Sequence, residues 1–277
     1  MRAWGEAIAG ALLALSLALP AQAQLVDLVS RTAFRVCADP ANLPFSNEVR
    51  DGFENEIAEL FAEKLGRELQ YTWYPMAQGF VRRTLMDQRC DVIVGYAQGD
   101  EMVLNTNHYY TSVYVLLTRA ASDLADVATL SDPRLEGRRI GVIAGTPPAS
   151  HLARHGLMAT VEGYALMVDT RVEHPNQDML DDLLSGELDA AIMWGPVGGR
   201  LAAAHDGEVV MTPLLAEPGA PRLYYRITMG VRQGDEVWKR ELNALIAELQ
   251  PEIDAILRDY DVPLVNDRGT AMKPATP

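Results

Sequence analysis

The chain has 277 residues, which is too long for one compact domain and suits two domains of ordinary size. Its formal net charge is -14, so its surface repels nucleic acids and anionic membranes, and we exclude both as binding partners. The charge is typical of a soluble protein and would also attract a basic protein partner. Hydrophobic residues make up 48% of the chain, which is ample for a core.

The first 23 residues have the pattern of a secretory signal peptide. Arg2 gives a small positive region, 7–19 is almost wholly apolar, and Ala21-Gln22-Ala23 matches the small-residue cleavage pattern. The apolar run is too short to span a bilayer comfortably, and no later segment is long and apolar enough. We therefore expect cleavage after Ala23 and an exported mature protein without a stable membrane span.

Strand and helix patterns alternate along the mature chain, which implies parallel sheets with right-handed crossover connections. In the first half we predict strands at 34–38, 69–73 and 90–96, and helices at 53–65 and 79–88. In the second half we predict extended segments or strands at 112–118, 139–143, 158–164, 189–193 and 223–231, and helices from Pro147, at 176–186 and at 235–260. Pro251 interrupts the last helix, and the tail from Asp261 is expected to be irregular.

This order of elements predicts an α/β protein with two lobes, each a mostly parallel sheet flanked by helices. We expect 24–115 and 225–277 to form one lobe and 119–222 to form the other. The extended segments near 112–118 and 223–231 would cross between the lobes. The last helix would return to the first lobe.

The two cysteines, Cys37 and Cys90, both lie in the mature chain. An even number of cysteines in an oxidising compartment predicts one disulfide, and their spacing is not that of a metal site. Cys37 lies in the first predicted strand and Cys90 opens the third. These strands are neighbours in a sheet of order 2-1-3, which supports the pairing.

The loop after the first strand is the leading candidate for a binding site. It carries Asp39, Asn42, Phe45 and Asn47, more than a simple connection needs. Ligands of open α/β sheets bind beyond the carboxyl ends of the strands, where this loop lies. We expect Asn42 and Phe45 to line a cleft, together with Thr146 in the matching loop of the second half; Asn42 and Asn47 could instead be turn residues.

Several segments resemble the family 3 extracellular solute-binding proteins that serve ABC importers. They are RVCADPANLPFS, GFENEIAELFAEKLG, RCDVIVGY, HYYTSVYVLL and GRRIGVIAGT. Within that family the chain resembles the MoxJ/XoxJ group of quinoprotein (PQQ) methanol dehydrogenase systems, through PFSNE, YTWYP, GFVRRTL, MWGPVGG and RITMGVR. The resemblance implies the two-lobed periplasmic-binding-protein type II fold.

The chain departs from the amino-acid binders of that family at both ligand-binding charges. Those binders carry an arginine soon after the third strand that holds the ligand carboxylate, whereas 97–110 contains no arginine or lysine here. They also carry an aspartate for the ligand ammonium where this chain has Trp194. An amino-acid zwitterion would lose both partners, at a cost on the order of several kcal/mol.

Aromatic residues occur where those charges are missing. The expected aromatic wall of the cleft consists of Phe45, Tyr96, Tyr109, Tyr110, Tyr114 and Trp194. Two alternatives stay open. Trp194 could be ordinary packing, since tryptophan is usually mostly buried, and at least one residue of the group Tyr109, Tyr110 and Tyr114 is expected in the core.

Signals of an enzyme are absent from the sequence. There is no G-x-S-x-G motif and no P-loop, and the two cysteines are expected to be paired, so no catalytic residue and no cofactor are predicted. His151 and His155 share a helical face without an H-E-x-x-H motif, and we interpret them as surface histidines rather than metal ligands. A dehydratase or lyase would need titratable groups in the cleft, for which only Asp39 and Glu54 are candidates.

We therefore interpret the chain as a non-enzymatic periplasmic accessory protein. The resemblance implies that it contacts a PQQ-dependent methanol or alcohol dehydrogenase or helps it mature, with a cytochrome c as a second candidate partner. The alternative is an ABC-importer receptor for a small neutral or aromatic solute that hinge closure traps.

Overall fold

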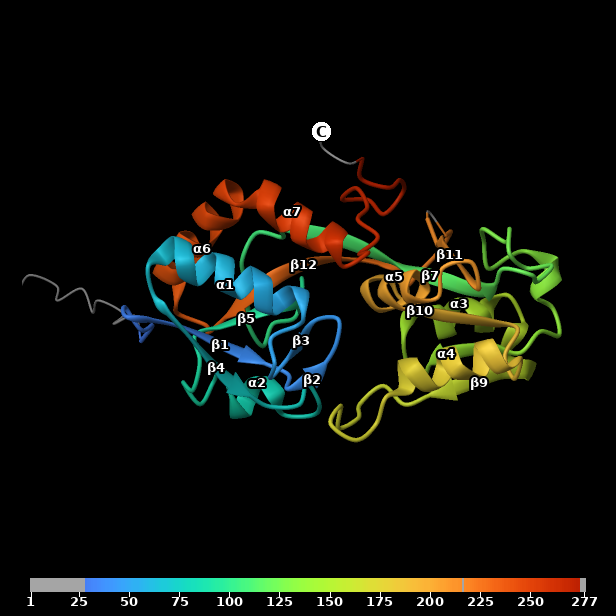
Figure 1. The fold of residues 1–277 in the computed structure, drawn as a ribbon, viewed down its shortest axis with the longest axis horizontal. Helices are drawn as coiled ribbons and strands as arrows, with labels where there is room; N and C mark the ends of the chain where they lie inside the picture. Colours follow the sequence, from blue (N-terminus) through green and yellow to red (C-terminus); the bar gives the residue numbers. More distant parts are fainter. Residues whose placement is uncertain (1–27, 216, 275–277) are drawn as a thin grey trace, which may run out of the picture.

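The computed structural model describes residues 28–215 and 217–274 and forms two lobes side by side (Figure 1). The expected signal peptide, 1–23, lies outside the described residues. The fold is α/β: helices flank a curled, mixed sheet that runs through both lobes in the order β4-β1-β5-β12-β7-β10-β8-β9. Among the described residues no helix has the length and apolar character that a membrane crossing requires.

Three parallel strands form the centre of the first lobe. They are β1 (Ala33–Ala38), β4 (Glu68–Trp73) and β5 (Val92–Ala97), with β1 in the middle. The antiparallel strand β12 (Tyr224–Val231) lies next to β5, and the short β6 (Leu104–Asn105) pairs with β12. The predicted neighbours of the first strand are therefore confirmed.

Helices cover both faces of this sheet, as the alternation of side chains along β1 requires. Phe34 and Val36 point to one face, where they pack in a core with α1 (Phe53–Leu65), α6 (Glu236–Glu248) and α7 (Gln250–Asp259). Cys37 points to the other face, towards α2 (Phe80–Arg83). The C-terminal helices thus pack on the first lobe, as predicted.

The second lobe repeats this arrangement. Its parallel strands are β8 (Ile140–Ile143), β9 (Val161–Tyr164) and β10 (Ala190–Trp194), with β8 in the middle. The antiparallel strands are β7 (Tyr110–Arg119) and β11 (Val209–Pro213). The helices are α3 (Pro147–Arg154), α4 (Pro175–Ser185), α5 (Gly195–Ala204) and the 3-10 turns η1 (Pro133–Leu135) and η2 (Leu157–Thr160).

Strand β7 belongs to both lobes. Its first part, Tyr110 to Val113, pairs with β12, and its second part, Tyr114 to Thr118, pairs with β10. The partner of β7 therefore changes between Val113 and Tyr114. This point is the structural junction of the two lobes.

The predicted disulfide between Cys37 and Cys90 is confirmed. The two Cα atoms are 5.4 Å apart, within the range that a disulfide needs. The two cysteines are 53 residues apart in the sequence. The bond ties β1 to the start of β5, and the buried residues Phe80 and Leu85 pack around it. It lies only two residues before Asp39, which opens the candidate loop.

One predicted helix is shorter in the structure than expected, and another is interrupted where expected. The helix expected at 79–88 is the single turn α2, because the hydroxyl of Thr84 donates to the carbonyl of Phe80 and the chain turns away. The long helix expected at 235–260 is interrupted, as predicted: α6 ends before Leu249, and Pro251 lies in the first turn of α7. Helix α5 and strand β11 were not predicted.

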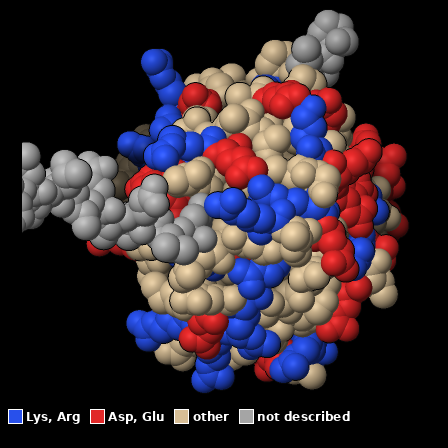
Figure 2. Space-filling view, turned by 90° about the vertical axis from the view of Figure 1, so that its left-hand side faces the viewer, with Lys and Arg blue, Asp and Glu red and all other residues tan. Residues whose placement is uncertain are grey.

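Acidic and basic side chains intermingle on the end of the molecule that the first lobe forms (Figure 2). Lys64 of α1 forms an ion pair with Glu248 of α6, and Arg67 lies 2.7 Å from Glu241 of the same helix. The net charge of -14 therefore does not make this face a uniformly acidic surface.

Candidate functional site

A cleft of about 1020 Å³ lies between the two lobes. The first lobe contributes the loop that follows β1, and the second contributes the end of β10, helix α5 and the segment between β9 and α4. Both lobes thus present the carboxyl ends of their strands to the cleft, as expected for this class of sheet. A volume of this size is at the upper end of the range for small-molecule sites.

The loop after β1 is folded tightly around Asp39, which is fully buried. Its carboxylate accepts hydrogen bonds from the backbone N–H of Ala41 at 2.9 Å and of Met76 at 2.5 Å. The backbone carbonyl of Asp39 accepts a bond from the Ser46 hydroxyl at 2.9 Å. These bonds hold the small hairpin of β2 (Ala41–Asn42) and β3 (Ser46–Asn47) at the edge of the cleft.

Phe45 is placed at the cleft by the start of helix α1. Its ring packs against Phe53, with 5.3 Å between the centroids. Gly52 precedes the helix, and a Cβ atom there would lie 2.2 Å from the carbonyl oxygen of Phe45. Glycine is therefore required at position 52 for the loop to approach the helix this closely.

A hydrogen bond joins the two lobes beside the cleft. The hydroxyl of Thr170 donates to Oδ1 of Asp39 at 2.7 Å. Thr170 lies in the segment between β9 and α4, which reaches towards β2 in Figure 1. We call this contact the Asp39–Thr170 latch.

An aromatic cluster forms the base of the cleft. The ring of Trp194, at the end of β10, meets Tyr114 of β7 edge-on at 5.3 Å and Tyr225 of β12 at 5.8 Å. Burial raises the pKa of Tyr114 well above its usual range, so this ring remains neutral. Trp194 is half-buried: it lines the cleft and also packs on the core of the first lobe. Both alternatives considered for this residue therefore apply.

The structure brings together part of the expected set of cleft residues. Asn42, Phe45, Tyr114, Thr146 and Trp194 all line the cleft. They come from four different elements or loops of both lobes.

The other three tyrosines of that set lie elsewhere, and the expectation is corrected for them. Tyr109 and Tyr110 are buried in the core of the first lobe, because β7 begins inside the sheet rather than at its rim. The Tyr109 hydroxyl donates to the carbonyl of Val94 at 2.9 Å. Tyr96 packs beside the disulfide on the face opposite α1, and its hydroxyl donates to Asp100 at 2.8 Å.

Exposed aliphatic side chains surround the cleft, and the sequence reasoning missed them. The side chains of Leu43 and Val49 on the first lobe are 53% and 73% exposed, and that of Leu166 on the second lobe is 52% exposed. Met76 of the first lobe also lines the cleft. We call Leu43, Val49, Met76 and Leu166 the apolar rim. The sequence did contain a signal for this rim: its residues are apolar but lie in loops, where no predicted strand or helix would bury them.

One arginine also lines the cleft and was not foreseen. Arg200 of α5 extends its guanidinium to 3.4 Å from Asp261 and lies 5.9 Å from the ring centre of Tyr260. It is the one lysine or arginine among the described residues that line the cleft, and more than half of its side chain is exposed. It is therefore available to an acidic group of a ligand or partner.

The candidate acid and base of the alternative enzyme are not on the cleft surface. Glu54, at the start of α1, is almost fully buried, and burial together with the nearby charge of Asp39 raises its pKa to about 8. Gly95 of β5 leaves the space for it, since a Cβ atom there would lie 1.8 Å from its Oε1. Neither Asp39 nor Glu54 is among the residues that line the cleft.

The interpretation of His151 and His155 as surface histidines is wrong for the first of them. His151 is fully buried on α3, and His155 is half-buried on the same helical face. Neither lines the cleft.

Comparison with known proteins identifies relatives along almost the whole chain. MoxJ of Methylorubrum extorquens is 33% identical over 284 residues, covering 94% of each chain. The crystal structure of the periplasmic binding protein XoxJ from Methylobacterium extorquens AM1 is 41% identical, with a TM-score of 0.73 over 85% of this chain and 100% of that one. MxaJ from Methlophaga aminisulfidivorans MPT is 25% identical, with a TM-score of 0.71 over 84% of this chain and 100% of its own.

The family model for bacterial extracellular solute-binding proteins, family 3, matches residues 34–261. This range begins in β1 and ends just after α7, so it contains both lobes and the cleft. The chain therefore belongs to the family 3 bacterial extracellular solute-binding proteins.

Proposed function

We propose that this chain is a non-enzymatic periplasmic accessory protein whose cleft contacts a PQQ-dependent methanol or alcohol dehydrogenase, or helps it mature. Its similarity to MoxJ, XoxJ and MxaJ supports the choice of partner, because the MoxJ/XoxJ group resembles it in sequence motifs and accompanies such dehydrogenase systems. A cytochrome c of the same system is a second candidate partner. We also propose export with cleavage after Ala23.

The apolar rim is the observation that carries this proposal. Leu43, Val49 and Leu166 are more than half exposed at the cleft. Phe45 and Trp194 line the same cleft. Exposed apolar surface of this kind marks a site of protein contact or ligand binding, since water does not stabilise it. Aromatic residues in a hollow with apolar neighbours are typical of the residues that dominate binding energy at protein interfaces.

We also propose bounds for the two lobes. We assign 24–115 with 225–277 to the first lobe and 119–222 to the second, with crossings near 112–118 and 223–231. The change of partner along β7 and the packing of α6 and α7 on the first lobe support these bounds.

The test is a binding titration of the chain against the dehydrogenase from the same periplasm. We expect the double substitution Trp194→Ala and Phe45→Ala to weaken binding by at least ~2 kcal/mol, about 30-fold, if these are anchor residues. Because Trp194 also packs on the core, Val49→Ser provides a second variant at a site that is 73% exposed.

The matched control is Val237→Ala, which removes an apolar side chain that is 57% exposed at the start of α6, outside the cleft. It should leave the affinity unchanged. Equal affinity of the parent, the double variant and the Val49 variant would place the interface elsewhere and remove the proposal.

An ABC-importer receptor for a small neutral or aromatic solute is the second candidate. The Asp39–Thr170 latch favours it, because solute-binding proteins trap their ligands by closing two lobes. Ordinary amino acids are poor candidates, since Trp194 takes the place of the ammonium partner. Calorimetric titration of the twenty amino acids should therefore give no dissociation constant near ~1 μM, whereas tight binding of a neutral solute would favour the importer.

A further inference from the structure

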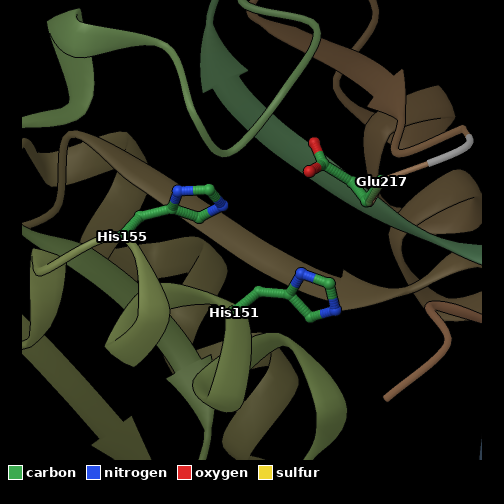
Figure 3. Close-up of side chains that lie close together, drawn as sticks. All are labelled: His151, His155 and Glu217. Carbon is green, nitrogen blue, oxygen red and sulfur yellow. The ribbon is translucent and has the colours of Figure 1, made fainter. Parts of the chain in front are cut away.

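We propose that His151, His155 and Glu217 form a binding site for a divalent transition metal, with zinc as the best match, on the second lobe. His151 lies on α3 and His155 directly follows the end of that helix, and Glu217 faces them from the loop after β11 (Figure 3). One nitrogen or oxygen atom from each residue lies within 4.8 Å of the other two. None of the three residues lines the cleft, so this site is independent of the proposed function.

His151 is already oriented as a metal ligand. It is fully buried, and its Nε2 lies 2.7 Å from the carbonyl oxygen of Pro221. A carbonyl only accepts, so Nε2 carries the proton and Nδ1 presents its lone pair. Metal-binding histidines typically donate their second ring N–H to such a backbone carbonyl, which fixes the ring and its tautomer.

The two other residues each offer a buried atom without a hydrogen-bond partner in the described part of the chain. These atoms are Nε2 of His155 and Oε2 of Glu217. The second oxygen of Glu217 accepts a bond from the backbone N–H of Leu130 at 2.7 Å, which holds the carboxylate in place. Buried polar atoms without partners are costly, and one cation between them would satisfy both at once.

The donor set fits zinc better than calcium or magnesium. Two imidazole nitrogens and one carboxylate oxygen are common zinc ligands, whereas calcium and magnesium prefer oxygen alone. Tetrahedral zinc with bonds of about 2.0 Å holds its ligand atoms roughly 3.3 Å apart. The three side chains therefore need only a modest inward rotation, and a water molecule would complete the coordination.

Arg154 competes with a metal for Nδ1 of His151. Its guanidinium lies 3.5 Å from Nδ1 of His151, at the limit of a hydrogen bond, and 3.2 Å from the carbonyl oxygen of Pro218. It also bonds the carbonyl oxygen of Ala220. A metal would displace only the weakest of these contacts, so the loop 217–221 would stay attached to α3.

The experiment is a calorimetric titration of the full chain with zinc sulfate after removal of metal with a chelator. We expect saturable binding of one zinc per chain and a rise in the melting temperature on zinc addition. His155→Ala and Glu217→Gln should each weaken zinc binding at least tenfold. Glu217→Gln keeps an oxygen for the bond to Leu130, so it tests the metal without removing that contact.

His108→Ala is the matched control, because His108 lies on the first lobe beside Asp267 and outside the site. It should bind zinc as the parent does. Circular dichroism checks that each variant is folded. Absence of zinc binding by the parent, or equal affinity in the parent and both site variants, would overturn the proposal.

Discussion

Glu54 is a buried carboxyl group that the fold keeps close to a second carboxylate. Burial and the charge of Asp39 raise its pKa from 4.5 to about 8, so it is mostly protonated at neutral pH. Between these two values the folded chain binds more protons at this residue than the unfolded chain does. The free energy of unfolding therefore falls as the pH rises from about 4.5 to about 8, and the full penalty applies above that window.

Glu54→Gln should remove this pH dependence. Glutamine has nearly the same shape and carries no charge, so at pH 9 the variant should be more stable than the parent by about 5 kcal/mol, at about 1.4 kcal/mol for each pH unit of the window. At pH 4 the two proteins should be nearly equal. Urea unfolding at several pH values measures the difference.

The control for this prediction is Glu59→Gln, which removes the same charge from an exposed position on α1. It should leave the pH dependence as it is in the parent. If Glu54→Gln were no more stable than the parent above pH 8, the buried carboxylate would have another source of stabilisation.

The position of a single residue relative to the cleft could be predicted where a rule of sheet topology applied to it. Phe45 and Trp194 follow strand ends, and the sequence places them at the cleft for that reason. Tyr109 and Tyr110 are also aromatic, but they lie just before and at the start of β7, which runs inside the sheet. Composition cannot distinguish these two surroundings. The partner of His151, the carbonyl of Pro221, lies 70 residues away along the chain, beyond the reach of local patterns.

At the scale of elements, helix α5 escaped prediction because its sequence, GPVGGRLAAA, is rich in glycine. The glycines are required by packing rather than by the helix itself. A Cβ atom on Gly195 would lie 2.3 Å from the carbonyl oxygen of Val113, and one on Gly199 would lie 2.1 Å from that of Asp261. By contrast, helix α1 has a regular apolar face and a terminal Gly66, and its predicted bounds are those of the structure.

Gly199→Ala should destabilise the protein, because the added methyl group meets the backbone of the segment after α7. Overpacking of this kind costs roughly 1–3 kcal/mol, even though alanine favours helices more than glycine does. Thermal unfolding of the purified variant measures the loss.

Gly163→Ala in β9 is the matched control for that substitution. The nearest atom to its added Cβ would be that of Ala144, at an ordinary distance of 3.7 Å. It should leave the melting temperature close to that of the parent. If both variants melted alike, the close approach of α5 to the C-terminal segment would not matter for stability.

At the scale of the whole molecule, the Asp39–Thr170 latch links the two lobes. Its hydrogen bond to a carboxylate is worth roughly 1.5–3 kcal/mol in a partly buried position. Thr170→Val keeps the shape of the side chain and removes the donor. We expect the variant to populate an open form at least about tenfold more than the parent does.

Small-angle X-ray scattering measures this opening as an increase in the radius of gyration. Thr72→Val is the matched control, since it also removes one hydroxyl bond, to the carbonyl of Arg89, but within the first lobe. The control should scatter as the parent does. An unchanged radius of gyration in the Thr170 variant would mean that other contacts hold the lobes together.

The aromatic cluster at the base of the cleft gives the molecule an optical reporter of its own conformation. Trp194 lies opposite Tyr114, next to the point where β7 changes its partner, whereas Trp73 and Trp238 are fixed within the first lobe by Tyr71 and Phe34. Any bending of β7 alters the surroundings of the Trp194 indole alone among these three. Its intrinsic fluorescence should therefore shift in wavelength when the lobes move or the cleft is occupied, without any attached dye.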